Sequence, residues 1–99
     1  MEYKNIARIK ELEAILDESR AIADDFLNAL DRYKKNQDNI KKLEAYYESQ
    51  DYLEDVDADN LGLIPKDLKR GILSEDSIYD LLRDNDYIND ILKNKSNGK

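Results

Sequence analysis

The sequence contains no cysteine and no histidine among its 99 residues. Without cysteine the chain cannot form a disulfide bond, and it has no thiol that could act as a nucleophile or bind zinc. Without histidine it lacks the side chain that most readily exchanges protons near neutral pH. A serine hydrolase site of the usual kind is therefore excluded, and the reducing cytoplasm is the expected location.

Glycine and long apolar runs are also scarce. The three glycines, at positions 62, 71 and 98, lie too far apart to hold a phosphate group with successive backbone amides, so nucleotide binding is not expected. No apolar stretch reaches the length of a signal peptide or of a membrane-spanning helix. We therefore expect neither export by the common route nor insertion into a membrane.

Positive charge is in deficit. Against 23 acidic residues there are 16 lysines and arginines, which gives a net charge of −7. The resulting field opposes contact with DNA, RNA and anionic lipid, so direct binding to nucleic acid is not expected. The same charge leaves open an inhibitor that imitates nucleic acid and occupies a basic protein.

Apolar residues recur at helical spacing along the first third of the chain, and Ser19 is the single polar interruption. This pattern predicts a long amphipathic helix that ends near Lys34 and Lys35, with Asn36 in a left-handed turn. Flanking residues, among them Ile15 and Ile22, widen the stripe, which favours a partner within the same chain, while the heptad-like spacing leaves a homodimer possible. The stripe consists of Ile9, Leu12, Leu16, Ala23, Phe26, Leu30 and Tyr33.

A second helix, antiparallel to the first, is predicted to start at Asp38 and to place Ile40, Leu43 and Tyr47 on one stripe. Between positions 51 and 59 five carboxylates occur in nine residues without a base. Their mutual repulsion should weaken a regular helix, so we expect a structured acidic connector there. Within it, Pro65 should open a short helical turn that Gly71 ends.

The last helix is predicted to begin after Ser74, a good N-cap, with Glu75 and Asp76 in its first turn. Polar residues at positions 84–86 interrupt its apolar face and could kink it. No strand is predicted anywhere. The expected fold is all-α, a small three-helix bundle that forms a single helical domain over residues 1–93, followed by a flexible tail at 94–99.

Acidic residues offer the few candidates for chemistry. Carboxylate pairs are common in so acidic a chain, so no enzyme is predicted, and Asp76 and Lys69 are merely the least implausible catalytic groups. Asp55, Asp57 and Asp59 match the first ligands of a calcium-binding loop, but Lys66 stands where a closing glutamate is needed. We name no metal site and no cofactor, and weak calcium binding at 54–59 in a cation-responsive module remains an alternative function.

Tyrosines surround the acidic connector and provide the main candidates for partner binding. Neighbours on a helix cannot both face one core, so one of Tyr46 and Tyr47 is expected to be exposed. Exposed tyrosine beside carboxylates is typical of a protein-binding surface, although the same rings could pack the connector onto the bundle. We expect a noncatalytic protein-protein interaction module whose face, around residues 46–79, includes Tyr46, Tyr47, Tyr52, Glu75, Asp76 and Tyr79.

One stretch of the chain also resembles a known family. The residues concerned are Tyr46, Tyr47 and Ser49, then Leu63, Pro65 and the segment KRGILSED at 69–76, followed by Ile78, Tyr79, Leu81 and Leu82. They are similar to the bacterial domain-of-unknown-function family numbered 4298, and the similarity is strong over residues 40–83. It implies a small acidic helical protein of bacteria, and it implies no activity, cofactor or catalytic residue.

Overall fold

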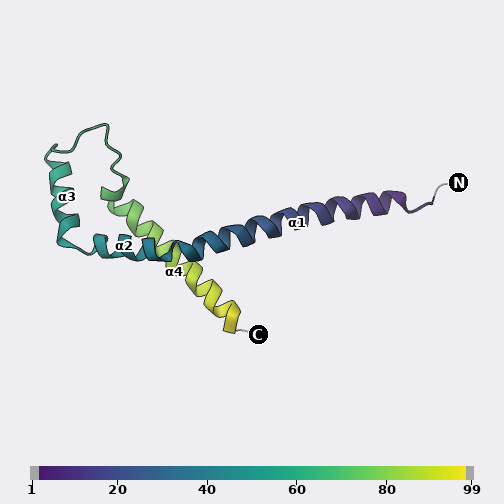
Figure 1. Ribbon diagram of the computed structural model, residues 1–99. Coiled ribbons are helices and arrows are strands. Elements are labelled where there is room, and N and C mark those ends of the chain that lie inside the picture. Colours follow the sequence, from purple (N-terminus) through teal and green to yellow (C-terminus); the bar gives the residue numbers. More distant parts are fainter. Residues whose placement is uncertain (1–2, 98–99) are drawn as a thin grey trace. The chain divides into compact units, whose positions relative to one another are not determined.

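The protein is all-α, as the sequence predicts. A computed structural model describes residues 3–97, with side chains through residue 94, and Figure 1 shows its elements in chain order. Within these residues the backbone forms four α-helices and one short 3-10 helix, and no strand. None of the described helices is long and apolar enough to cross a membrane.

Two compact units divide the chain, residues 1–37 and residues 38–99. We call them the N-terminal unit and the C-terminal unit. The N-terminal unit holds α1 (Ile6–Lys35), and the C-terminal unit holds α3 (Gln50–Asn60), the 3-10 helix η1 (Gly71–Leu73) and α4 (Glu75–Asn97). Helix α2 (Gln37–Tyr47) begins at the boundary. The predicted single domain and the antiparallel packing of the first two helices stay predictions.

Helix α1 ends at Lys35, where the sequence predicts, and three basic residues in its last turn complement the negative end of the helix dipole. The expected left-handed turn at Asn36 is wrong, because Asn36 has φ −88° and ψ −2°, in the right-handed helical region. Its backbone N–H bonds to the carbonyls of Arg32 and Tyr33. Since α2 starts one residue later, Asp38 lies in the first turn of α2 instead of capping it.

The acidic run forms helix α3, so the prediction of an acidic connector in place of a regular helix is wrong for residues 51–59. The backbone at Ser49 is extended, which interrupts the helical conformation after α2. The Ser49 hydroxyl accepts a hydrogen bond from the backbone N–H of Tyr52 at 3.2 Å. This N-cap starts a new helix. Two carboxylates of the run also have partners. Asp55 accepts a hydrogen bond from the Tyr46 hydroxyl, and Asp59 forms an ion pair with Arg70, so the repulsion among the carboxylates is smaller than expected.

Helix α3 ends in a Schellman motif around Gly62. The backbone N–H of Leu63 bonds to the carbonyl of Ala58 at 2.9 Å, and that of Gly62 bonds to the carbonyl of Asp59 at 3.0 Å. Gly62 has φ +76°, a left-handed conformation in which glycine carries no side-chain penalty. The glycine that ends a helix is therefore Gly62, and the prediction that Gly71 does so is wrong, because Gly71 opens η1.

A turn and the 3-10 helix lead from Gly62 to α4. Pro65 opens a turn, as predicted, which a hydrogen bond from the Leu68 N–H to the Pro65 carbonyl closes at 3.1 Å. Helix η1 contacts both α3 and α4. Ser74 then caps α4, since its hydroxyl accepts a hydrogen bond from the Ser77 N–H at 3.4 Å. Helix α4 runs unbroken past the polar residues 84–86 and past the domain end predicted at residue 93.

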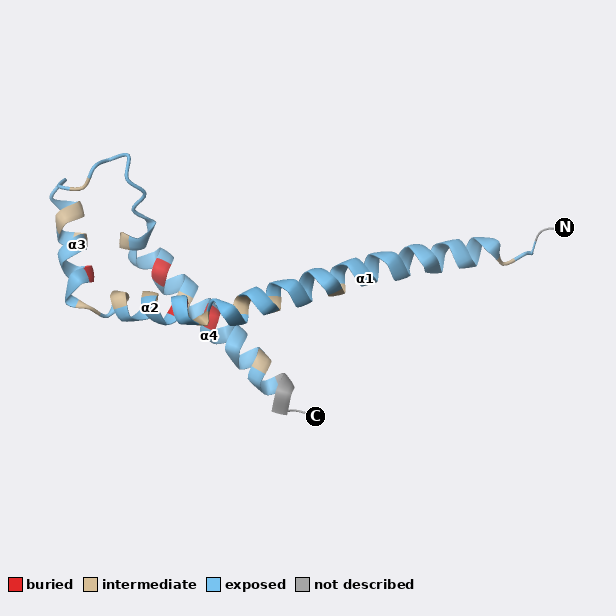
Figure 2. Cartoon of the chain, in the orientation of Figure 1, coloured by how far each residue is buried: buried red, intermediate tan, exposed pale blue. Residues whose placement is uncertain are grey.

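The core of the C-terminal unit is small. Its buried side chains are Ile40 of α2, Tyr52 of α3, and Ile78 and Asn85 of α4, which Figure 2 shows in red. Asn85 and Ile78 are seven residues apart, so they lie on the same face of α4. The polar residue predicted to interrupt the helix therefore faces the interior. Among the described residues no buried side-chain nitrogen or oxygen lacks a hydrogen-bond partner.

Candidate functional site

Three tyrosines form a cluster where α2 meets α3. The ring of Tyr52 lies edge-on to that of Tyr46, with centroids 5.5 Å apart, and to that of Tyr47, with centroids 5.3 Å apart. Tyr52 is 8% exposed, and Tyr46 and Tyr47 are both half-buried. The expectation that one of the pair Tyr46 and Tyr47 is exposed is therefore wrong. Both side chains can be partly covered because the ring of Tyr52 packs against the rings of Tyr46 and Tyr47 at the same time.

A hydrogen bond connects Tyr46 of this cluster to Asp55 of helix α3. The hydroxyl of Tyr46 donates to a carboxylate oxygen of Asp55 across 2.6 Å. Desolvation, followed by this bond and the charge of Asp55, raises the pKa of Tyr46 from 10 to about 12. Ser49, whose hydroxyl donates to the Tyr46 carbonyl at 2.6 Å, completes the corner. The cluster therefore fixes the angle between α2 and α3.

Tyr47 links this corner to the start of α4. Desolvation raises the pKa of Tyr47, and the next contributions come from the charge of Glu75 and from Tyr52, then from Tyr79 and Asp76. Four of the other predicted partner-binding residues, Tyr52, Glu75, Asp76 and Tyr79, therefore lie close enough to Tyr47 to raise its pKa. Within this group Tyr79 is 53% exposed, and Glu75 and Asp76 are exposed as well. These three side chains are the accessible part of the predicted face.

An apolar hollow of about 180 Å³ lies in the C-terminal unit. Helix α2 provides one of its walls, and η1 and the first two turns of α4 provide the others. The first two turns of α4, which form part of the wall, also carry the exposed carboxylates Glu75, Asp76 and Asp80, and none of these lines the hollow. The residues that line the hollow are Leu43, Gly71, Ile72, Ser77, Ile78 and Leu81.

The sequence predicts the apolar character of the lining but not the hollow itself. Leu43, Ile78 and Leu81 are predicted on core-facing stripes, and Ile78 is buried, whereas Leu81 remains exposed. Ile72 was assigned to a connector because its three-residue 3-10 helix is too short to produce an apolar period. No local signal would have shown that Ile72 and Leu43 line the same hollow, since that depends on how the elements pack.

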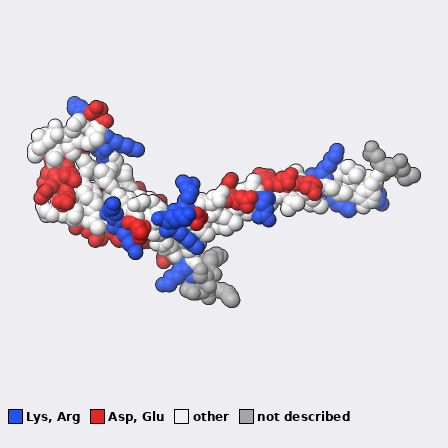
Figure 3. Space-filling view, viewed as in Figure 1, with Lys and Arg blue, Asp and Glu red and all other residues white. Residues whose placement is uncertain are grey.

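The acidic residues of α3 do not form a metal site. Residues two apart on a helix point about 200° apart, so Asp55, Asp57 and Asp59 are directed to different sides. Asp55 is bonded to Tyr46, and Asp59 is paired with Arg70. Within residues 3–97 no group of three or more ligating side chains is placed so that it could hold a metal ion. Figure 3 shows acidic side chains gathered over α3, as a charged surface.

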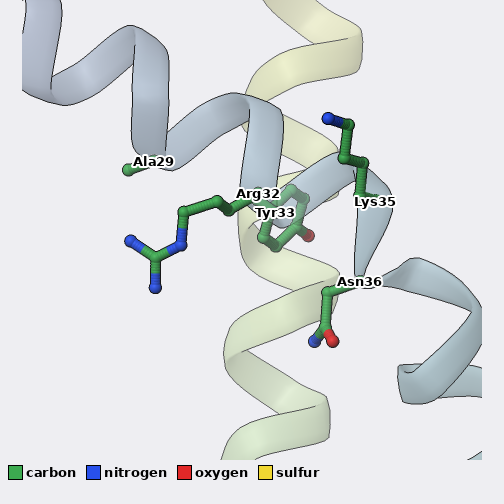
Figure 4. A pocket seen from close by; sticks show the side chains of 5 residues that line it. All are labelled: Ala29, Arg32, Tyr33, Lys35 and Asn36. Atoms are coloured by element: carbon green, nitrogen blue, oxygen red, sulfur yellow. The ribbon is translucent and has the colours of Figure 1, made fainter.

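A second hollow, of about 470 Å³, lies on the N-terminal unit near the end of α1. Its lining includes two cations, Arg32 and Lys35, and a site for an anion would need both charges to converge. Figure 4 shows that the two side chains extend in different directions, Arg32 to the left and Lys35 upward, so that their charged ends lie apart. Because their charges do not meet, this hollow does not have the geometry of a phosphate or carboxylate site.

Comparison with known proteins yields one match. The family described as Domain of unknown function (DUF4298) matches residues 9–93, which extends the similarity of residues 40–83 to most of α1 and α4. Neither a curated protein nor a solved structure matches the chain.

Proposed function

This chain belongs to the family described as Domain of unknown function (DUF4298), and we propose from its own geometry that it is a noncatalytic protein-protein interaction module. The observations that carry the proposal are an apolar hollow in the C-terminal unit and, on the same first two turns of α4, the exposed side chains of Tyr79, Glu75 and Asp76. Protein interfaces combine an apolar depression with aromatic anchors and a polar rim. We call this combination the α4 face, and we place the protein in the bacterial cytoplasm.

The surrounding scaffold supports this role. The α4 face rests on a corner that the tyrosine cluster, the Ser49 cap and the Tyr46–Asp55 hydrogen bond hold in place. A rigid surface loses little conformational entropy when it binds, so more of the contact energy remains as affinity. The buried tyrosines therefore contribute to binding indirectly, by positioning, while Tyr79 and the hollow meet the partner.

Charge selects the partner. Residues 38–99 hold 15 of the 23 acidic side chains but only nine of the 16 basic ones, so the C-terminal unit carries most of the negative charge. We therefore propose a protein partner with lysine or arginine around an apolar anchor. A nucleic-acid-mimicking inhibitor is a special case of this proposal, in which double-stranded DNA competes with the acidic protein for the partner.

The test is affinity capture from host lysate with a matched pair of variants. Tyr79→Ala removes an anchor from the α4 face, and Tyr87→Ala makes the same change on the same helix at a side chain that is 67% exposed. We expect Tyr79→Ala to weaken recovery of the partner about 30-fold, the effect of losing a hot-spot residue, and Tyr87→Ala to leave recovery unchanged.

Raising the salt concentration from about 0.05 M to 0.5 M should also weaken recovery, because it screens the acidic surface. Equal effects of the two tyrosine variants would contradict the assignment of the α4 face. Loss of capture that occurs only together with loss of helical circular dichroism would contradict it as well, since the defect would then be one of folding.

A further inference from the structure

Among the described residues, α1 is the one complete helix of the N-terminal unit, so no other element of this unit covers the apolar stripe of α1. Although all 30 residues of α1 lie within the described part of the chain, none of them is buried. Phe26, in the middle of the stripe, is 61% exposed, and Leu12 and Leu16 are also exposed. Helices of this kind draw most of their stability from packing an apolar face, so a face of this length requires a partner.

We infer that a second copy of the chain covers this stripe, as an antiparallel pair of α1 helices. Stripe positions alternate by three and four residues, as in a heptad repeat. The second helix runs in the reverse direction, and the twofold axis crosses the pair at the level of position 21 of each helix. In this register large residues of one copy face large residues of the other, and the small residues Ser19 and Ala23 face each other at the centre. The facing pairs are Ile9 with Tyr33, Leu12 with Leu30, Leu16 with Phe26, and Ser19 with Ala23.

The two flanks of the stripe are compatible with antiparallel pairing. One flank carries Arg8, Ile15, Ile22 and Ala29, and the other carries Glu13, Arg20, Leu27 and Lys34. An antiparallel pair sets each flank against its own copy, so Ile15 contacts Ile22 of the second copy and Glu13 approaches Lys34 of the second copy. A parallel pair sets one flank against the other, which places Glu13 beside Arg8 instead of Lys34. Arg20, near the axis, already pairs with Asp24 of its own helix at 3.7 Å.

The charge of the C-terminal unit favours the same direction. This unit follows the C-terminal end of α1, and it holds 15 acids against nine bases. A parallel pair would bring two such units together at one end. An antiparallel pair attaches them at opposite ends of a helix about 45 Å long, far beyond the screening length of about 8 Å at physiological salt. The repulsion between the units is then removed.

Sedimentation equilibrium of the full chain tests the association. We expect a dimer at about 50 µM, about tenfold or greater weakening by Ile22→Lys, and no weakening by Ala21→Lys. The two variants add the same charge to neighbouring residues, but Ala21 lies on the polar face of α1. A monomeric wild-type chain, or equal weakening by both variants, would overturn the inference. It does not depend on the α4 face, whose capture experiment can succeed or fail separately.

A charge exchange keeps the test valid if Ile22→Lys unfolds the helix. Glu13→Lys and Lys34→Glu should each weaken the dimer about threefold to tenfold, since each replaces two attractive pairs across the interface with two repulsive ones, and exposed ion pairs are individually weak. The double variant should restore association to within about twofold. In a parallel pair these residues do not meet, so absence of restoration would overturn the antiparallel arrangement.

The lack of native cysteine allows a direct check of direction. We expect a mixture of Ser19→Cys and Ala23→Cys chains to form mainly the mixed disulfide on mild oxidation, because these two positions face each other across an antiparallel pair. A predominance of cross-links between two Ser19→Cys chains would indicate parallel pairing and would overturn the inference.

Discussion

Tyr46 shows how one side chain can join two helices of this protein. Its ring packs on Tyr52, and its hydroxyl donates to Asp55 nine residues along the chain. The ring could have been anticipated from sequence as part of an aromatic cluster. The hydroxyl bond could not, because its acceptor belongs to a run of acids that the sequence assigns to a connector. Tyr46 therefore joins α2 to α3 through its ring and its hydroxyl.

Replacing Tyr46 with phenylalanine should lower the free energy of unfolding by about 0.5–1.5 kcal/mol at neutral pH, the usual net value of a hydrogen bond. The pKa of Tyr46 is raised to about 12, so the folded chain keeps its proton after the unfolded chain loses it near pH 10. This contribution is complete below pH 10 and is lost as pH rises to about 12.

Urea denaturation followed by circular dichroism checks this prediction. Wild type should lose its advantage over Tyr46→Phe between pH 10 and pH 12, whereas Tyr87→Phe should behave as wild type throughout. A constant difference between wild type and Tyr46→Phe over this range would contradict the assigned role of the Asp55 hydrogen bond.

Ser49 acts at a single position to separate α2 from α3. The Ser49→Ala change leaves the Tyr52 N–H without its acceptor and should cost about 1 kcal/mol, as is usual for an N-cap. Thermal unfolding is the measurement. Asn28→Ala on exposed α1 is a suitable control, because alanine is the better helix former there and no cap is lost.

At the scale of elements, Gly62 and Gly71 form a matched pair. Neither has another atom within 4 Å of an added Cβ, so sterics against neighbours do not distinguish them. Only Gly62 has a positive φ. Gly62→Ala should therefore destabilise the chain by about 1–2 kcal/mol, and Gly71→Ala should be neutral or stabilise it by up to about 1 kcal/mol. A comparable loss in both variants would contradict the role of Gly62 as the C-terminal cap of α3.

Elements with strong local signals were predicted well. The end of α1 follows from the basic residues Lys34 and Lys35, and the start of α4 follows from the N-cap Ser74. Helix α3 was missed because its stability depends on partners that sequence spacing does not reveal, namely Tyr46 for Asp55 and Arg70 for Asp59. The same limit applies to the site, since the hollow forms where α2, η1 and α4 bring Leu43, Ile72 and Ile78 together, and sequence spacing does not show this.

At the scale of the whole molecule, the two units differ in composition. The N-terminal unit is nearly neutral, with seven basic and eight acidic residues in positions 1–37, while the C-terminal unit holds the remaining excess of acid. A nearly neutral helix with an apolar stripe suits association with a like helix, and an acidic unit with a hollow suits a different, basic partner. The division of charge thus matches the proposed division between assembly and recognition.

This division predicts that helicity depends on protein concentration. If α1 is stabilised by a second copy, mass action should reduce its helical content on dilution and lower the midpoint of thermal unfolding. Circular dichroism at about 1 µM and 100 µM would measure both. Ile22→Lys should show no such dependence, and a wild-type chain with the same spectrum at the two concentrations would contradict the expectation.

The ion pair between Asp59 and Arg70 has a practical consequence. It joins the end of α3 to the residue before η1, and between these two anchors the chain has no helix. An enzyme such as trypsin could cut after Lys66 or Lys69 and leave the fragments held together. The same interval would accept a fluorescent label or a short epitope between positions 63 and 69, outside the residues that line the hollow and outside α1, which would allow the protein to be followed in living cells.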